Sequence, residues 1–206
     1  MSKKVVIIDY GMGNLGSISN MLKYIGADSI ITSDHNIIEN AEKIILPGVG
    51  HFDRAMNNIN ELNLVEILRK KSLIDKVPFL GICLGMQLMC RNSEEGNKDG
   101  LGLINADVTG FNLDRAYKVP HMGWNLIEPK NDNKILENLD SNSKFYFVHS
   151  YFVKADDESN VLTYTNYGQQ FASGITNNEN IFGVQFHPEK SHKYGVTLFK
   201  NFIEKY

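Results

Sequence analysis

The stretch "PFLGICLGMQLMC" at residues 78–90 decides the fold class, because a short apolar run leads into a cysteine that stands between two glycines. The apolar run over 78–82 predicts a buried strand, and residues 84–92 predict a helix. A strand, a Gly-x-Cys-x-Gly turn and a helix in this order have the form of a nucleophile elbow. The pattern therefore predicts a sharp turn that presents the sulfur of Cys83 at the end of a sheet.

The residues around the cysteine support this interpretation. Gly81 and Gly85 carry no Cβ atom, so strand and helix can approach closely there. The helix that follows points its positive end at the sulfur of Cys83, and the backbone N–H of Leu84 can stabilise an oxyanion. The alternative is a small buried cysteine that only packs. We expect that role for Cys90, which lies inside the predicted helix without flanking glycines.

The remainder of the chain predicts one α/β domain over 1–206. The first part alternates strands over 4–11, 29–33, 43–50 and 78–82 with helices over 15–25, 55–72 and 84–92. Such alternation is typical of parallel strands with helices on both faces. The second half has strand-like runs over 144–153, 161–167 and 180–186, and a last helix over about 194–204. We expect a single domain with a mostly parallel, flavodoxin-like central sheet flanked by helices, plus extra antiparallel strands in the C-terminal half.

Composition excludes several classes of function. The net charge of -3 gives no basic footprint, so we expect no nucleic-acid partner. The apolar runs are too short to cross a membrane, and the first one ends at Asp9, too early for a signal peptide. The sequence has only two cysteines, which excludes a disulfide framework and favours a reducing cytoplasm.

The segment "GVQFHPEKS" at 183–191 supplies a candidate base for the cysteine. Pro188 biases His187 towards an extended conformation, in which residues two apart point the same way. The carboxylate of Glu189 can therefore orient the imidazole of His187. The alternative is a surface histidine beside a coincidental acid. A position at a predicted strand end, in a chain that also carries the cysteine turn, favours the catalytic interpretation.

Two glycine-containing loops follow the first and third predicted strands. In "LPGVG" at 46–50, the glycines leave the backbone around Val49 free to turn its N–H towards the cysteine, although an ordinary turn is the alternative. In "GMGN" at 11–14, the dinucleotide pattern is incomplete and no lysine is present, so we do not expect a phosphate site. Asn14 can instead cap the helix over 15–25, which Gly26 can end.

Together these motifs resemble the class I, or triad, glutamine amidotransferases. Within that family the chain is similar to the glutaminase subunits of imidazole glycerol phosphate synthases. The segments that carry the likeness are "DYGMGNL" (9–15), "PGVG" (47–50), "CLGMQLM…SEEG" (83–96), "GLGLI" (100–104), "KVPHMGWN" (118–125), "YFVHSY" (146–151) and "GVQFHPEKS" (183–191). The likeness spans nearly the whole chain.

The resemblance implies a role for each matching residue. It implies that Cys83 is the nucleophile, His187 the general base and acid, and Glu189 its orienter, with oxyanion N–H groups from Val49 and Leu84. The residues that it implies for glutamine binding are Gly48, Gly50, Gln87, Glu95, His149, Ser150 and Tyr151. Those that it implies for the partner surface are Asn14, His121, Met122 and Trp124. Without the resemblance, the sequence favours a core position for Trp124. It likewise favours an ordinary aromatic side chain in a strand for Tyr151.

The implied reaction hydrolyses L-glutamine to glutamate and ammonia through a cysteine thioester. The implied partner is a cyclase subunit of (β/α)₈ type, which forms a heterodimer with an ammonia channel and makes imidazole glycerol phosphate in histidine biosynthesis. No metal and no organic cofactor is implied.

The assignment to histidine biosynthesis stays open at this point. The segments "CRN" (90–92), "INADVTGF" (104–111) and "SHKYG" (191–195) depart from the pattern expected of the family. The chain is therefore alternatively a paralogous glutaminase that supplies ammonia to a synthase aminating surface sugars. A different cysteine hydrolase on the same turn and a catalytically silent binding module stay open as well.

Overall fold

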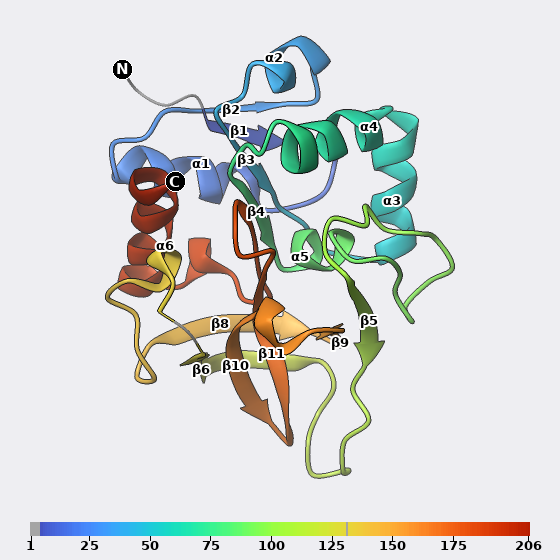
Figure 1. Cartoon of the computed structure of the whole chain (residues 1–206). Coiled ribbons are helices and arrows are strands. Elements are labelled where there is room, and N and C mark those ends of the chain that lie inside the picture. Colours follow the sequence, from blue (N-terminus) through green and yellow to red (C-terminus); the bar gives the residue numbers. More distant parts are fainter. Residues whose placement is uncertain (1–4, 131) are drawn as a thin grey trace.

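The computed structural model describes residues 5–130 and 132–206, and its centre is a parallel sheet with helices on both faces (Figure 1). The parallel strands lie in the order β2-β1-β3-β4-β12, with bounds Ser29–Thr32, Val5–Ile8, Lys43–Leu46, Phe79–Ile82 and Ile181–Val184. This is the 2-1-3-4-5 order of flavodoxin-like sheets, so the predicted fold class is confirmed.

Two layers of helices cover this sheet. Alternate residues of β1 face opposite sides, since Val5 and Ile7 belong to one core cluster and Val6 and Ile8 to the other. The first cluster includes the apolar faces of α1 (Leu15–Tyr24) and α6 (His192–Lys205). The second includes those of α2 (His35–Glu39), α3 (Phe52–Glu61), α4 (Leu64–Arg69) and α5 (Leu84–Leu88). Burial on both faces explains why the central strands are apolar throughout.

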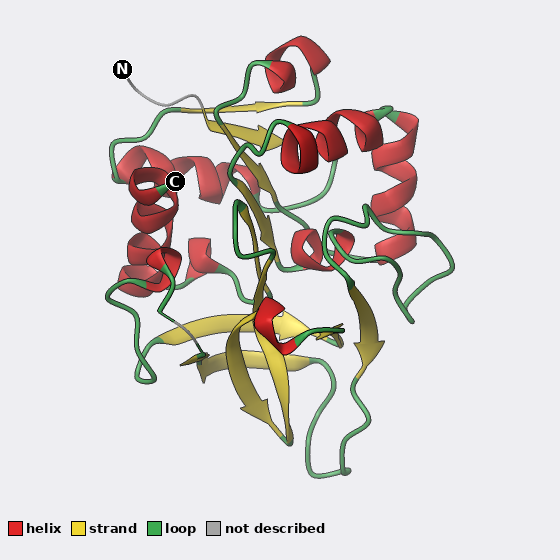
Figure 2. Cartoon of the chain, in the orientation of Figure 1, coloured by secondary structure: helices red, strands yellow, loops and turns green. Residues whose placement is uncertain are grey.

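Antiparallel strands extend the sheet beyond β12, as predicted for the C-terminal half (Figure 2). They are β11 (Gln169–Thr176), β10 (Val161–Tyr167), β7 (Glu128–Pro129), β9 (Tyr151–Ala155) and β5 (Ala106–Gly110). A separate antiparallel pair is formed by β6 (His121–Leu126) and β8 (Lys144–His149). Single 3-10 turns lie at Lys134–Leu136, Glu158–Asn160 and Pro188–Lys190. None of the helices in the described ranges is long and apolar enough to span a membrane.

Several predicted boundaries are wrong. The helix predicted over 55–72 is two helices, α3 and α4, because Asn63 adopts a left-handed conformation (φ 55°) between them; a π-helical turn, Lys70–Ile74, follows α4. The strand predicted over 144–153 is also two strands in different sheets, β8 and β9, which turn at Ser150. The helix predicted over 84–92 ends at Leu88.

The carboxyl ends of the parallel strands meet at one edge of the sheet, where flavodoxin-like folds bind ligands. Tyr10 follows β1, the "PGVG" loop follows β3, Cys83 follows β4, and Gln185 follows β12. The sequence did not reveal that β12, drawn from the end of the chain, pairs in parallel with β4. That pairing brings the segment "QFHPE" beside the cysteine turn.

Candidate active site

Cys83 occupies the predicted elbow between β4 and α5. Its backbone has φ 54° and ψ -111°, a strained conformation for a residue with a side chain. A Cβ on Gly85 would lie 1.8 Å from the carbonyl oxygen of Leu46, and one on Gly81 would lie 2.8 Å from the carbonyl oxygen of Gly85. The prediction that these two glycines permit a close approach of strand and helix is therefore confirmed.

Two hydrogen bonds involve the sulfur of Cys83 among the described residues. Its S–H donates to the Val148 carbonyl oxygen at 3.9 Å, and the side-chain amide of Gln185 donates to Sγ at 3.7 Å. Cys83 lines a cavity, and the residue is 6% exposed. Cys90 is fully buried, and burial raises the pKa of its thiol, so its predicted packing role is confirmed.

His187 and Glu189 lie together, as their spacing predicts. His187 has an extended backbone, and its Nδ1–H donates to the Glu189 carboxylate at 2.8 Å. Burial lowers the pKa of His187, but interactions with the Cys83 side chain and with Glu189 outweigh it and hold that pKa above its ordinary value. The Nε2 atom of His187 is buried without a hydrogen bond of regular geometry among the described residues. Free enzymes often hold such catalytic contacts loosely until substrate binds.

Strand β8 holds the histidine segment against the cysteine turn. Tyr146 forms a backbone bridge with His187, whose N–H donates to the Tyr146 carbonyl oxygen at 2.9 Å. Ser191 braces the same turn, since its hydroxyl donates to the His187 carbonyl oxygen at 2.6 Å and accepts from the Tyr146 N–H at 3.1 Å. Two residues further on, Val148 contacts Cys83. One strand therefore fixes the distance between the two reactive side chains.

A cavity of about 280 Å³ opens onto Cys83. Its lining residues are Val49, Gly50, Cys83, Leu84, Gln87, Glu95, Pro120, Val148, His149, Ser150 and Tyr151. All the residues expected to bind glutamine are among them except Gly48. That glycine lies behind the cavity, where a Cβ would lie 2.5 Å from the Tyr10 hydroxyl and 2.9 Å from the Gly85 nitrogen.

Both expected oxyanion residues, Val49 and Leu84, line this cavity beside Cys83. Leu84 is the first residue of α5, so its N–H has no acceptor within the helix. Tyr10 anchors the loop that carries Val49, because its buried hydroxyl donates to the Pro47 carbonyl oxygen at 2.6 Å. Burial, and then the charge at Cys83, raises the pKa of Tyr10, which keeps this hydroxyl a donor.

Two cavity residues present acceptors to a ligand. The side-chain amide nitrogen of Gln87 donates to the Tyr151 carbonyl oxygen and to Gln185 Oε1, both at 3.0 Å. Both of its hydrogens are therefore engaged, and Oε1 accepts no hydrogen bond from the residues that the structure describes, so it can accept from a ligand. Glu95 accepts from the Phe52 N–H at 2.8 Å through one carboxylate oxygen. Together, these groups favour a cationic group at this end of the cavity.

His149 lines the cavity, but both of its ring nitrogens are engaged within the protein. Nδ1–H donates to the Tyr151 carbonyl oxygen at 2.9 Å, so Nε2 must accept, and it accepts from His121 Nδ1–H at 2.9 Å. Asn125 donates to His121 Nε2 at 3.2 Å. Burial lowers the pKa of His121 to about 4 and is the main cause that lowers the pKa of His149 to about 3, so both rings are neutral at pH 7.

The residues expected at the partner surface differ in their exposure. Met122 and Trp124 are 61% and 49% exposed on the outer face of β6, so the alternative of a core tryptophan is wrong. His121 is buried on the opposite face, and its expected position at the surface is wrong, because side chains alternate along a strand. Asn14 makes no side-chain cap; its amide donates to Glu189 at 3.4 Å.

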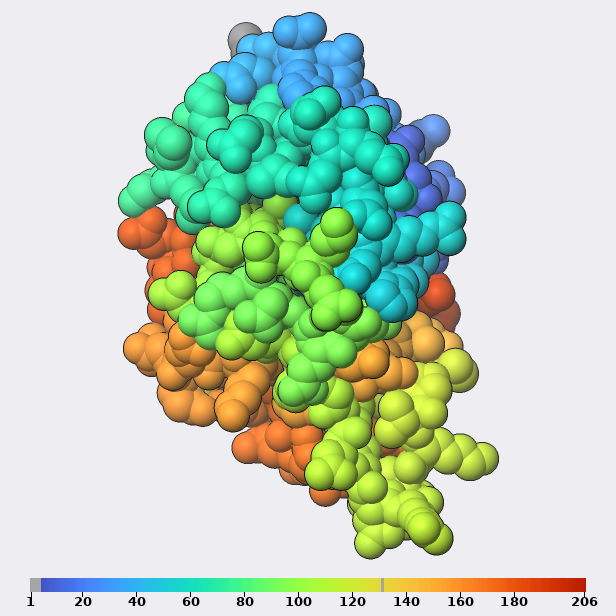
Figure 3. Space-filling model, turned by 90° about the vertical axis from the view of Figure 1, so that its right-hand side faces the viewer, coloured from blue at the N-terminus to red at the C-terminus, as the bar shows by residue number. Residues whose placement is uncertain are grey.

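Beside β6, the segment 111–120 projects from the body of the molecule (Figure 3).

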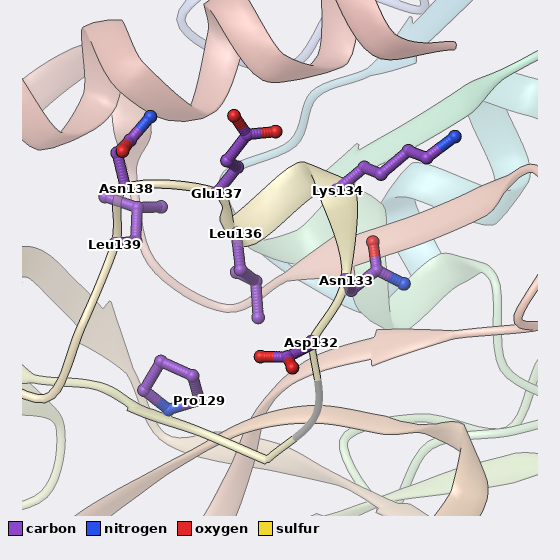
Figure 4. Close-up of a pocket in the computed structure, with 8 residues that line it drawn as sticks. All are labelled: Pro129, Asp132, Asn133, Lys134, Leu136, Glu137, Asn138 and Leu139. Atoms are coloured by element: carbon purple, nitrogen blue, oxygen red, sulfur yellow. The ribbon is translucent and has the colours of Figure 1, made fainter.

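A second cavity, of about 380 Å³, lies near the 3-10 turn Lys134–Leu136 (Figure 4). Its lining residues are Pro129, Asp132, Asn133, Lys134, Leu136, Glu137, Asn138 and Leu139. Leu136 points into it, and none of the predicted catalytic residues lines it. The chemistry therefore favours the smaller cavity at Cys83.

Sequence reasoning missed three residues of the site. Val148 and Pro120 line the cavity through loop and strand positions that no local pattern marks. Gln185 contacts the cysteine sulfur and is fully buried. Its place in "GVQFHPE", two residues before the histidine, is the signal that could have found it.

Comparison with known proteins identifies the family that the sequence motifs resemble, and the match covers nearly the whole chain. The family model described as glutamine amidotransferase class-I matches residues 6–206. An "imidazole glycerol phosphate synthase subunit HisH 2" of Methanococcus maripaludis is 54% identical over 98% of this chain and 99% of its own length. A second protein of that organism, named subunit HisH 1, is 44% identical over 97% of this chain and 98% of its own length.

Solved structures agree on the fold. A chain of PurLQS from Thermotoga maritima superposes with a TM-score of 0.77 at 18% identity, over 100% of this chain and 99% of that one. Identity this low is evidence of the fold alone. The family model and the curated relatives carry the assignment: this chain belongs to the class-I glutamine amidotransferase family.

Proposed function

We propose that the chain is the glutaminase subunit of an imidazole glycerol phosphate synthase, which hydrolyses L-glutamine and passes ammonia to a cyclase subunit. The observation that carries the proposal is a strained Cys83 at the wall of a small cavity, whose side chain interacts with the buried pair of His187 and Glu189. Relatives named as subunits of that synthase support the pathway. A catalytically silent module is disfavoured, because it would not need a strained cysteine beside a buried histidine–carboxylate pair.

The cavity suits the amino-acid part of glutamine. The free Oε1 of Gln87 and the carboxylate of Glu95 would accept from the α-ammonium group. Backbone N–H groups and the hydroxyl of Ser150 would donate to the α-carboxylate. Held in this way, the side-chain amide of the substrate would lie against the sulfur of Cys83, which lines the same cavity.

The proposed reaction has two halves. The sulfur of Cys83 attacks the amide carbon and forms a C–S bond, while the N–H groups of Val49 and Leu84 hold the oxyanion. His187 then gives a proton to the departing nitrogen as the C–N bond breaks, which releases ammonia and leaves a glutamyl thioester. A protonated His187 is the form required, and its raised pKa favours that form. In the second half, His187 takes a proton from water, whose oxygen attacks the thioester carbon; the C–S bond then breaks, which frees glutamate and restores the Cys83 thiolate beside a protonated His187.

The partner would dock beside this site. Met122 and Trp124 form an exposed apolar patch on β6, and Asn14 links the neighbouring surface to Glu189. Ammonia released into water would be protonated and lost, so a docked (β/α)₈ subunit with a channel is the expected acceptor. We expect the pair to work in the cytoplasm, where the nucleophilic cysteine stays reduced.

A second candidate function rests on a specific observation. One organism carries two named relatives, and this chain is more similar to the one numbered 2 than to the one numbered 1. Two copies in one cell are compatible with two different acceptors. The second candidate is a paralogous glutaminase whose ammonia goes to another acceptor, for which we propose a synthase that aminates surface sugars.

Glutamate release measured against partner concentration tests both. We expect slow release by the isolated chain and faster release with a histidine-pathway cyclase and its nucleotide substrate. Stimulation by a sugar-aminating synthase alone would move the pathway to the alternative and leave the chemistry intact. Full activity of the isolated chain would contradict the expected control by a partner, and asparagine or other amides hydrolysed equally well would contradict the substrate.

A further inference from the structure

Gln185 is a buried polar residue that the reaction above does not use. It follows β12 at the end that faces the site, and its backbone N–H donates to the Ser173 carbonyl oxygen at 2.9 Å. Its side chain is fully buried and lies between Gln87 and Cys83. A buried amide costs free energy unless its hydrogen bonds are made, so each of its contacts deserves a reason.

The orientation of this amide follows from a neighbouring carbonyl group. The backbone oxygen of Tyr151 can only accept, so the group of Gln87 that faces it at 3.0 Å must be its NH₂. The second hydrogen of that NH₂ points to Gln185 at 3.0 Å, so the atom of Gln185 that receives it must be Oε1. The NH₂ group of Gln185 therefore faces the sulfur of Cys83, at 3.7 Å.

We propose that Gln185 is, besides His187, a side-chain hydrogen-bond donor that stabilises the ionised sulfur of Cys83, and that Gln87 is the residue that positions it. Two other polar groups face the sulfur: the Val148 carbonyl oxygen can only accept and so stabilises the thiol, whereas His187, when protonated, supplies the opposite charge. Helix α5 has only five residues, which limits what its dipole contributes. This inference rests on the proposed role of Cys83 as nucleophile.

The test is the rate of Cys83 alkylation by iodoacetamide between about pH 5 and about pH 10, in the isolated chain. Only the thiolate reacts, so the rate follows the ionised fraction. In Gln185→Met, which keeps the bulk and removes the donor, we expect about tenfold slower alkylation at neutral pH, since hydrogen bonds to charged groups are among the strong ones. The rates should converge at high pH. Profiles that superimpose on wild type in a folded variant would overturn the proposal.

Two further variants control this result. Gln170→Met makes the same change at an exposed position and should leave the profile unaltered. Gln185→Glu is isosteric and keeps the acceptor for Gln87, but it places an oxygen against the sulfur; it should slow alkylation at least as much as Gln185→Met. An unchanged rate in Gln185→Glu would count against the donor role.

A measurement on the wild-type chain keeps the proposal testable if both variants fail to fold. The chain has glutamines at 87, 169, 170 and 185 only, so their side-chain amide signals can be assigned in a ¹⁵N-glutamine sample. The Gln185 amide protons should shift with the same pH midpoint as alkylation, and a Gln185 signal that stays constant through that midpoint would overturn the proposal. Neither experiment uses glutamine or a partner, so their failure leaves the proposed function standing, and loss of the proposed function leaves their result unchanged.

Discussion

Replacing Gly85 with alanine should damage both the stability and the chemistry of the cysteine turn. A Cβ at this position would lie 1.8 Å from the Leu46 carbonyl oxygen, whereas real contacts of this kind stay above 3.0 Å. Helix α5 or the end of β3 must therefore move by about 1.2 Å, and both are backbone. Forcing extra bulk into a packed site costs about 1–3 kcal/mol. In a chain of this size, each kcal/mol lowers the Tm by about 2–4 °C.

The same shift should also lower kcat, because it moves an oxyanion donor. Leu84, one of the two expected oxyanion donors, precedes Gly85, and donors work only within about 2.7–3.1 Å of the oxyanion. A shift of this size removes one donor, which costs about 10²–10³ in kcat.

Thermal unfolding and glutamate release with the partner present measure the two effects. Gly16→Ala is the matched control: Gly16 is an exposed helical glycine, and no atom lies within 4 Å of the place that an alanine Cβ would take. Alanine there should leave turnover unchanged and stability equal or higher. Wild-type Tm and turnover in Gly85→Ala would refute the reasoning.

Three other predictions follow from the site. Glu189→Gln should reduce turnover less than His187→Ala, because an orienting group tunes the imidazole that transfers the protons; equal losses would contradict this division of roles. Tyr10→Phe should lower the free energy of unfolding by about 1–3 kcal/mol, because it leaves a buried carbonyl oxygen without its donor; an unchanged urea midpoint would contradict it. Stability should fall as the pH drops from 6.5 towards about 4, because the unfolded chain binds protons at His121 and His149 that the folded chain, with pKa values of about 4 and about 3, does not. Urea unfolding across this range should show a shallower pH dependence in His121→Phe, and an identical slope would contradict the assignment.

The cysteine turn and the histidine segment could be predicted because their chemistry is local. Gly81, Gly85 and Cys83 sit within one strand, turn and helix, and each has a steric or electrostatic reason that needs no distant neighbour. The alternation of His187 and Glu189 follows in the same way from extended geometry. The parallel sheet was predictable because alternating strands and helices have few other arrangements.

The parts that could not be predicted depend on long-range pairing. The parallel pairing of β12 with β4 places Gln185 against Cys83, and nothing within "GVQFHPE" specifies that partner strand. The position of His121 was misjudged because one residue of register decides which face of β6 it occupies. Asn14 was assigned to a helix cap by propensity, but Glu189 lies close enough to take its amide instead.

Trapping the covalent intermediate tests the central claim most directly. The chain with its synthase partner would be mixed with ¹³C-labelled L-glutamine, quenched in acid during turnover, digested with trypsin and analysed by mass spectrometry. Cys83 and Cys90 fall on one peptide, since the flanking cleavage sites are Lys76 and Arg91, so fragment ions must separate them. We predict a labelled glutamyl group on Cys83, an unmodified Cys90, and loss of both adduct and glutamate release in Cys83→Ala with its fold intact. Glutamate release that persists in Cys83→Ala, or a label on Cys90, would contradict the account.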